Sequence, residues 1–76
     1  MPNRDNEIKV LLALRESGNS PLTTEQLAVK TGLSPSQAND AAHKLNYFGM
    51  AYIYLRGNGG YRRHPAGNRK LADLGL

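Results

Sequence analysis

The sequence contains no cysteine, and this absence excludes disulfide bonds and metal sites built from thiolates. It also lacks a long apolar run, because the longest one, residues 10–14, is about a quarter of the length that a membrane-spanning helix needs. We expect no signal peptide, since the opening residues are mostly polar and carry charges of both signs. These absences predict a cytoplasmic protein without membrane contact.

The chain length predicts one domain over residues 1–76. A domain of this size buries only about 60% of its unfolded surface, so association with a second copy would add stability. The net charge of +4 and the pI near 9.8 favour a polyanionic partner. This positive charge is local. Residues 1–50 are close to neutral, whereas Arg56, Arg62 and Arg63 bracket one glycine-rich turn, and a local cluster is typical of nucleic-acid contact.

The stretch of residues 33–50 predicts a helix over about residues 35–48. Ser34 is a favourable N-cap, Pro35 suits the first helical position, and Gln37 completes a capping box with Ser34. At 100° per residue, one side carries the small and apolar residues Ala38, Ala41, Ala42, Leu45, Phe48 and Gly49. The outer side carries the polar residues Ser36, Asp40, His43 and Tyr47, flanked by Asn39 and Lys44. This pattern is expected of a helix that enters a DNA groove.

Two further helices are predicted before this one. The first covers about residues 5–17, ends at Gly18, and presents an apolar face made of Ile8, Leu11, Leu12 and Leu14. The second covers about residues 24–31, begins with a Thr23–Gln26 capping box, faces inward with Leu27 and Ala28, and ends at Gly32. Only residues 32–34 separate it from the next helix, which is the tight spacing of a helix-turn-helix.

After Gly49 the spacing of apolar residues changes from a helical period to the period of two that a strand has. This change predicts a hairpin over about residues 51–64. The alternation predicts a strand whose buried face holds Ala51, Ile53 and Leu55. A two-residue turn centred on Asn58 and Gly59 would pair Arg56 with Tyr61 and Tyr54 with Arg63. A three-residue loop would instead turn Arg62 outward beside Tyr54.

Residues 65–67 are predicted to end this hairpin. A final helical turn over residues 68–74 would then dock Leu71 and Leu74 on the first helix. The predicted hairpin must also lean on the helices, because a two-stranded hairpin alone is barely stable in water.

This order of elements resembles the winged helix-turn-helix family of bacterial and phage DNA-binding proteins. The resemblance is carried by residues 22–28, 31–34, 44–45 and 49–50, and residues 56–62 are similar to the glycine-rich wing of Rrf2-type regulators. It implies an α+β, mainly helical fold with a three-helix core, a two-stranded wing and a short C-terminal helical turn. It also implies a transcriptional regulator. Asn39 and Asp40 depart from the Ser-Arg pair that many winged helices carry.

The predicted contacts with double-stranded DNA divide by chemistry. Ser36, Gln37, Asn39 and His43 would reach base edges, and Asp40 could accept a hydrogen bond from cytosine. Thr24, Lys44 and the helix N-termini, including Ser34, would hold phosphates. The wing residues Arg56, Asn58, Arg62 and Arg63 would lie at the minor groove or the adjacent backbone.

Other functions are weighed against this one. A winged helix that binds only another protein is the main alternative, since the first fifty residues are nearly neutral. Exposed tyrosines beside arginines could also stack on single-stranded bases. An enzyme is not expected, because Ser36, Asp40 and His43 lie on one outward helix face without an evident pocket. His43 and His64 lack further zinc ligands, so neither a metal nor a cofactor is predicted. A homodimer or a neighbouring regulatory protein is a further expected partner.

Overall fold

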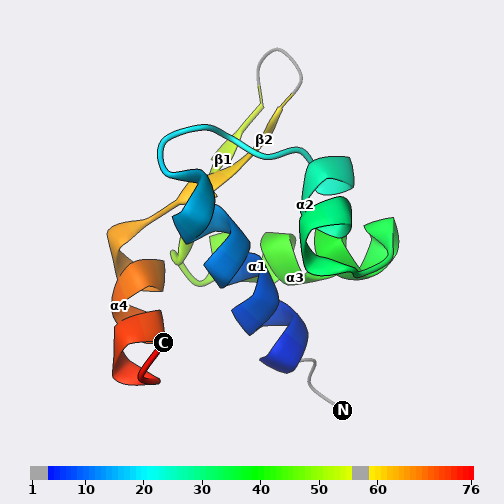
Figure 1. Cartoon of the computed structure of the whole chain (residues 1–76). Coiled ribbons are helices and arrows are strands. Elements are labelled where there is room, and N and C mark those ends of the chain that lie inside the picture. The colour runs from blue at the N-terminus through cyan, green and yellow to red at the C-terminus, as the bar shows by residue number, and fades with distance from the viewer. Residues whose placement is uncertain (1–3, 56–58) are drawn as a thin grey trace.

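The chain folds as helices α1 to α3 followed by a hairpin and a fourth helix (Figure 1). The computed structural model describes residues 4–55 and 59–76. Its elements are α1 (Arg4–Ser17), α2 (Thr24–Thr31), α3 (Pro35–Tyr47), β1 (Ala51–Tyr54), β2 (Gly60–Arg63) and α4 (Pro65–Asp73). None of the helices it describes is long and apolar enough to cross a membrane. The architecture is a winged helix, and the predicted fold class is confirmed.

Both predicted capping boxes are present. At α2, the Thr23 hydroxyl accepts from the Gln26 backbone N–H at 3.2 Å, and the Thr23 N–H donates to Gln26 Oε1 at 2.8 Å. Ser34 and Gln37 make the same reciprocal pair at 3.1 Å in each direction. Gly32 ends α2 in the left-handed conformation, with φ of 75°, which a side chain would disfavour. The short turn between the two helices is therefore fixed by local hydrogen bonds.

The core lies where α1, α2 and α3 meet, and it extends to the hairpin and α4. Its buried members are Val10, Leu11, Ala13, Leu14, Leu22, Leu27, Ala28, Ala38, Ala41, Ala42, Leu45, Ala51, Tyr61 and Leu71. The predicted alanine-rich face of α3 is confirmed. On α1 the buried face differs from the prediction, because Val10 and Ala13 are buried together with Leu11 and Leu14 where α2, α3, β2 and α4 pack against the helix. Ile8 and Leu12, which were predicted to be buried, are only partly buried at the edge of this face.

Two residues assigned to the buried face of α3 lie outside the core. The helix ends at Tyr47, and Gly49 turns the chain with φ of 74°. Phe48 is consequently 59% exposed and packs edge-on against Tyr47, with ring centroids 5.3 Å apart. The helical periodicity used for the prediction no longer applies once the helix has ended.

The predicted register of the hairpin is wrong. Tyr54 pairs with Gly60 rather than Arg63, and Tyr61 pairs with Ile53 rather than Arg56. The pairing of Tyr54 with Gly60 leaves residues 55–59 between the strands, instead of a two-residue turn. On its other edge, β2 is held by Leu22, which forms an isolated bridge with Tyr61 through two backbone hydrogen bonds of 2.8 Å. This bridge fixes β2 against the loop between α1 and α2. The predicted turn centre at Asn58 lies outside the described residues.

The new register changes what the hairpin buries. Ala51 and Tyr61 reach the core, whereas Ile53 is 38% exposed and Leu55 is 85% exposed. The hairpin extends beyond the helices (Figure 1), so the outer end of β1 lies away from the core. The prediction of a buried face made of Ala51, Ile53 and Leu55 therefore holds only for Ala51.

The C-terminal helix begins earlier than predicted. Residues 65–67 end the strand as expected, but they also form the first turn of α4, with Pro65 at its start and His64 as N-cap. Gly67 allows α4 to pack closely, since a Cβ there would lie 2.8 Å from Leu11 Cδ2 and would overlap the Met50 carbonyl. Leu71 is buried, whereas Leu74 is 42% exposed and only partly fulfils its predicted docking.

Candidate functional site

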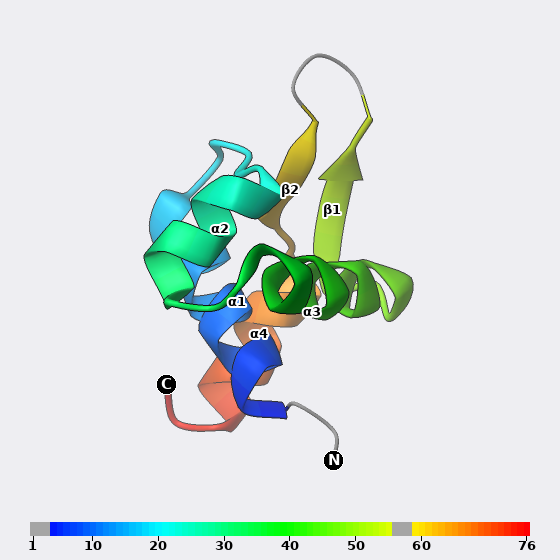
Figure 2. The same ribbon diagram turned by 90° about the vertical axis from the view of Figure 1, so that its right-hand side faces the viewer.

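The outer surface of α3 is a polar ridge supported by a buried apolar face. Figure 2 shows α3 in front, with the hairpin rising above it. α3 packs directly against β1, so the two elements adjoin. The residues of α3 that were predicted to contact DNA are all exposed: Ser36, Gln37, Asn39, Asp40, His43 and Lys44. Small alanines on the inner side bring α3 close to its neighbours without covering the ridge.

Some of the predicted contact residues already have partners inside the protein. Gln37 and Ser34 each give their side-chain oxygen to the capping box. Lys44 Nζ lies 3.8 Å from Glu7 Oε2 on α1, which makes a partly exposed ion pair. In high dielectric such a pair is weak, at about 0–1 kcal/mol, so Lys44 can exchange this partner for a phosphate at little cost.

Four ridge residues remain available for an external partner. Ser36, Asn39, Asp40 and His43 make no side-chain hydrogen bond or ion pair to any other described residue. Thr24 opens α2 beside its N-cap and is half-buried. It thus stands at a helix N-terminus, where backbone N–H groups favour an anion.

The described arginines of the hairpin, Arg62 and Arg63, contact other residues of the protein. Arg62 lies opposite Tyr52 across the strands, and its guanidinium carbon is 5.0 Å from the Tyr52 ring centre and 5.4 Å from that of Tyr54. Arg62 Nε is buried and has no hydrogen-bond partner among the described residues. The Tyr52 ring also packs against His64, with centroids 4.5 Å apart. This row of side chains covers the face of the hairpin that does not pack on the core.

Arg63 is held by a residue of the loop after α1. Its Nη2 donates to Asn19 Oδ1 at 3.3 Å, which ties β2 to the loop after α1. A shallow groove of about 540 Å³ runs past these groups and is lined by Asn19, Tyr52, Arg62, Arg63, Pro65 and Asn68. The structure thus brings Arg62 and Arg63 together in one groove, while Arg56 and Asn58 lie outside the described residues.

Asn19 and Asn68 were not predicted as members of any site. No local pattern identifies them, because they come from a loop and a helix separated by 49 positions in the sequence. The alternation of Tyr52, Tyr54 and Arg62 did contain a signal. The three-residue loop considered above places Arg62 on the tyrosine side of the hairpin, as observed, although its exact pairing differs.

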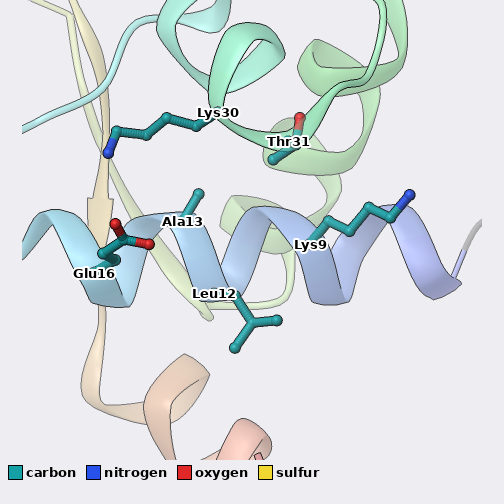
Figure 3. A pocket seen from close by; sticks show the side chains of 6 residues that line it. All are labelled: Lys9, Leu12, Ala13, Glu16, Lys30 and Thr31. Atoms are coloured by element: carbon teal, nitrogen blue, oxygen red, sulfur yellow. The ribbon is translucent and has the colours of Figure 1, made fainter.

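A second hollow lies between α1 and α2. Figure 3 shows its lining, in which Lys30 extends along α1 toward Glu16 while Leu12 points away from α2. The Thr31 hydroxyl donates to the Leu27 carbonyl at 2.6 Å and accepts from the Leu33 N–H at 3.3 Å, so the fold itself uses it. Nowhere in residues 4–55 or 59–76 do three His, Asp or Glu side chains gather in a way that could hold a metal ion.

The sequence matches no protein-family model and no curated protein. The fold matches solved structures. A MarR family transcriptional regulator from Silicibacter pomeroyi superposes with a TM-score of 0.83 at 23% identity, over 92% of this chain and 46% of that one. A protein from Ralstonia eutropha JMP134, suggested to bind DNA, superposes with a TM-score of 0.76 at 25% identity, over 92% of this chain and 94% of that one. This chain therefore spans less than half of the first protein and nearly all of the second.

Proposed function

We propose that this chain binds double-stranded DNA selectively and acts in the cytoplasm as a transcriptional regulator, with α3 in the major groove. The observation that carries the proposal is the ridge of α3, where Ser36, Asn39, Asp40 and His43 are exposed and unpaired among the described residues. Exposed hydrogen-bonding side chains on a rigid helix are what base-edge readout requires. The suggested DNA binding of the Ralstonia protein, which is of similar length, supports the same function.

The other residues of the proposed interface would have supporting roles. The N-terminus of α2 at Thr24 and the weakly paired Lys44 would contact phosphates. The hairpin would lie along the flanking backbone, with Arg56 and Asn58 as its contact residues. Arg62 and Arg63 would act mainly by holding the hairpin in place, because both have partners inside the protein. A second copy of the chain would double the number of base contacts. No part of this function is catalytic.

The test is a fluorescence-anisotropy titration of a random-sequence duplex at about 50 and about 200 mM salt. With about four phosphate contacts, the affinity should fall roughly a hundredfold between the two conditions, because binding releases condensed counterions. An affinity that does not change with salt, or no binding at either concentration, would contradict the proposal.

A protein partner is the second candidate function, and one observation favours it. Tyr47 is 79% exposed and Phe48 is 59% exposed, and they form a T-shaped pair directly beyond the polar ridge. Exposed aromatic pairs are typical of protein interfaces. Binding through such a pair depends on apolar burial, so it would persist at high salt and would be lost in a Phe48→Ala variant.

A further inference from the structure

The base preference of α3 is determined by which side chains the fold leaves available, and this inference rests on the proposed function. Reading adenine with Gln or Asn uses both ends of the amide, since its oxygen accepts from adenine N6 while its nitrogen donates to N7. The Gln37 oxygen already accepts from the Ser34 N–H at 3.1 Å. Gln37 is therefore held at the helix start, and reading adenine would require the cap to open.

Asn39 has no such constraint. Its side chain is exposed and makes no hydrogen bond to a described residue, so both ends of its amide are available. It lies two positions beyond Gln37 on the same rigid helix, where the buried Ala38 and Ala41 fix the backbone on either side. Asn39, rather than Gln37, is thus the amide that can read adenine.

Asp40 is the next residue, and its side chain is negatively charged, whereas the side chains that typically contact DNA are positive or neutral. A helical partner for Asp40 would be Lys44, four residues later, but Lys44 is paired with Glu7 instead. The carboxylate therefore remains unpaired among the described residues. Of the four bases, cytosine offers an amino group in the major groove without an adjacent acceptor, whereas guanine presents only acceptors, which a carboxylate repels.

The spacing of the two residues matches that of the bases. Asn39 and Asp40 are consecutive residues of α3, so their side chains diverge by about 100° around the helix axis with a rise of about 1.5 Å. Their tips are therefore separated by more than the backbone rise, which lets them reach successive base pairs that are about 3.4 Å apart. We propose that α3 selects duplexes in which Asn39 meets an adenine and Asp40 meets a cytosine in the adjacent base pair. Both contacts read exocyclic amino groups, so the target is defined by a pair of neighbouring amino donors in the major groove.

The experiment is selection of bound duplexes from a random pool with the whole chain, followed by titration of the enriched sequence and its point changes. We expect adjacent adenine and cytosine in the enriched sequence, and replacing that cytosine by guanine should weaken binding about tenfold. In the D40N variant this penalty should largely disappear, because an amide can donate to guanine. An N39A variant should lose the preference for adenine.

A Q37A variant is the matched control. It should keep the base preference, since Gln37 serves the cap, although it should unfold at lower denaturant concentration. Enrichment of sequences without the adenine–cytosine pair, with binding still strongly salt-dependent, would overturn this inference and leave the proposed function standing. Loss of the adenine preference in Q37A but not in N39A would also overturn it. Absence of any duplex binding would overturn both.

Discussion

The ridge of α3 and the outer face of the hairpin are both polar surfaces, but they differ in what their side chains already do. On α3, Asn39, Asp40 and His43 are exposed and unpaired among the described residues. On the hairpin, Arg62 lies against two tyrosine rings and Arg63 donates to Asn19. The hairpin carries more positive charge, yet its described arginines, Arg62 and Arg63, already have partners inside the protein. Availability, and not charge alone, therefore identifies the surface that can read a partner.

The largest expected difference between the two regions is in how much a truncated leucine side chain lowers the free energy of unfolding. Leu45 of α3 is 2% exposed, so Leu45→Ala should lower the free energy of unfolding by about 2–5 kcal/mol through lost burial and a cavity. Leu55, after β1, is 85% exposed, and Leu55→Ala should change the free energy of unfolding by less than about 0.5 kcal/mol. Urea denaturation of both variants measures this. Equal losses would show that the hairpin stem is buried in solution.

The capping box provides the next largest effect. Ser34→Ala removes the hydroxyl that accepts from the Gln37 N–H and should cost about 1 kcal/mol of stability. Ser36 is the matched control, because it is exposed on the same helix and its hydroxyl has no partner among the described residues. Ser36→Ala should leave the denaturation midpoint nearly unchanged. If both serines contribute equally, Ser34 and Gln37 are not locked in the cap.

A smaller effect is expected from the arginine on the hairpin. The coupling between Arg62 and Tyr52, measured by a double-mutant cycle with Arg62→Ala and Tyr52→Leu, should be about 0.5–1 kcal/mol for a partly exposed cation–π contact. Because this arginine serves the fold, Arg62→Ala should not change the salt slope of duplex binding. A slope reduced by about one would instead assign it a phosphate contact.

The smallest effect is a pH dependence of the stability that arises from Tyr61, the buried tyrosine of β2. Burial raises the pKa of Tyr61 above its usual value of 10.0. The unfolded chain therefore releases this proton at lower pH than the folded chain does. The contribution of Tyr61 to stability is fully present below about pH 10 and is lost as pH rises through the higher folded pKa. Denaturation from pH 9 to 11 should show a steeper loss for the native sequence than for Tyr61→Phe.

The same two regions show what could be predicted from sequence. The two capping boxes, the glycine at the end of α2 and the alanine face of α3 depend on residues within a few positions of each other, and the structure contains all of them. The attachment of β2 to the helical core depends on a bridge from Tyr61 to Leu22, which lies 39 positions earlier in the sequence. No turn signal within residues 51–64 contains that constraint. Because the observed register differs from the predicted one, Tyr54 and Arg63 pair with residues other than those predicted.

The candidate site follows the same division. Exposure of the α3 ridge could be predicted from helical periodicity, because α3 is regular throughout. The loss of Gln37 to the cap was also contained in the sequence, since a capping box that is predicted implies a side chain that is used. The engagement of Arg63 by Asn19 could not be predicted, because it depends on how the loop after α1 meets β2.

The most direct measurement is the change in backbone amide NMR shifts when a duplex is added to the labelled protein. If α3 is the DNA-reading surface, the largest changes will map to residues 34–47 and the start of α2, while α4 and the C-terminal half of α1 will change little. Changes confined to α1 and α4, with α3 unaffected, would contradict the account.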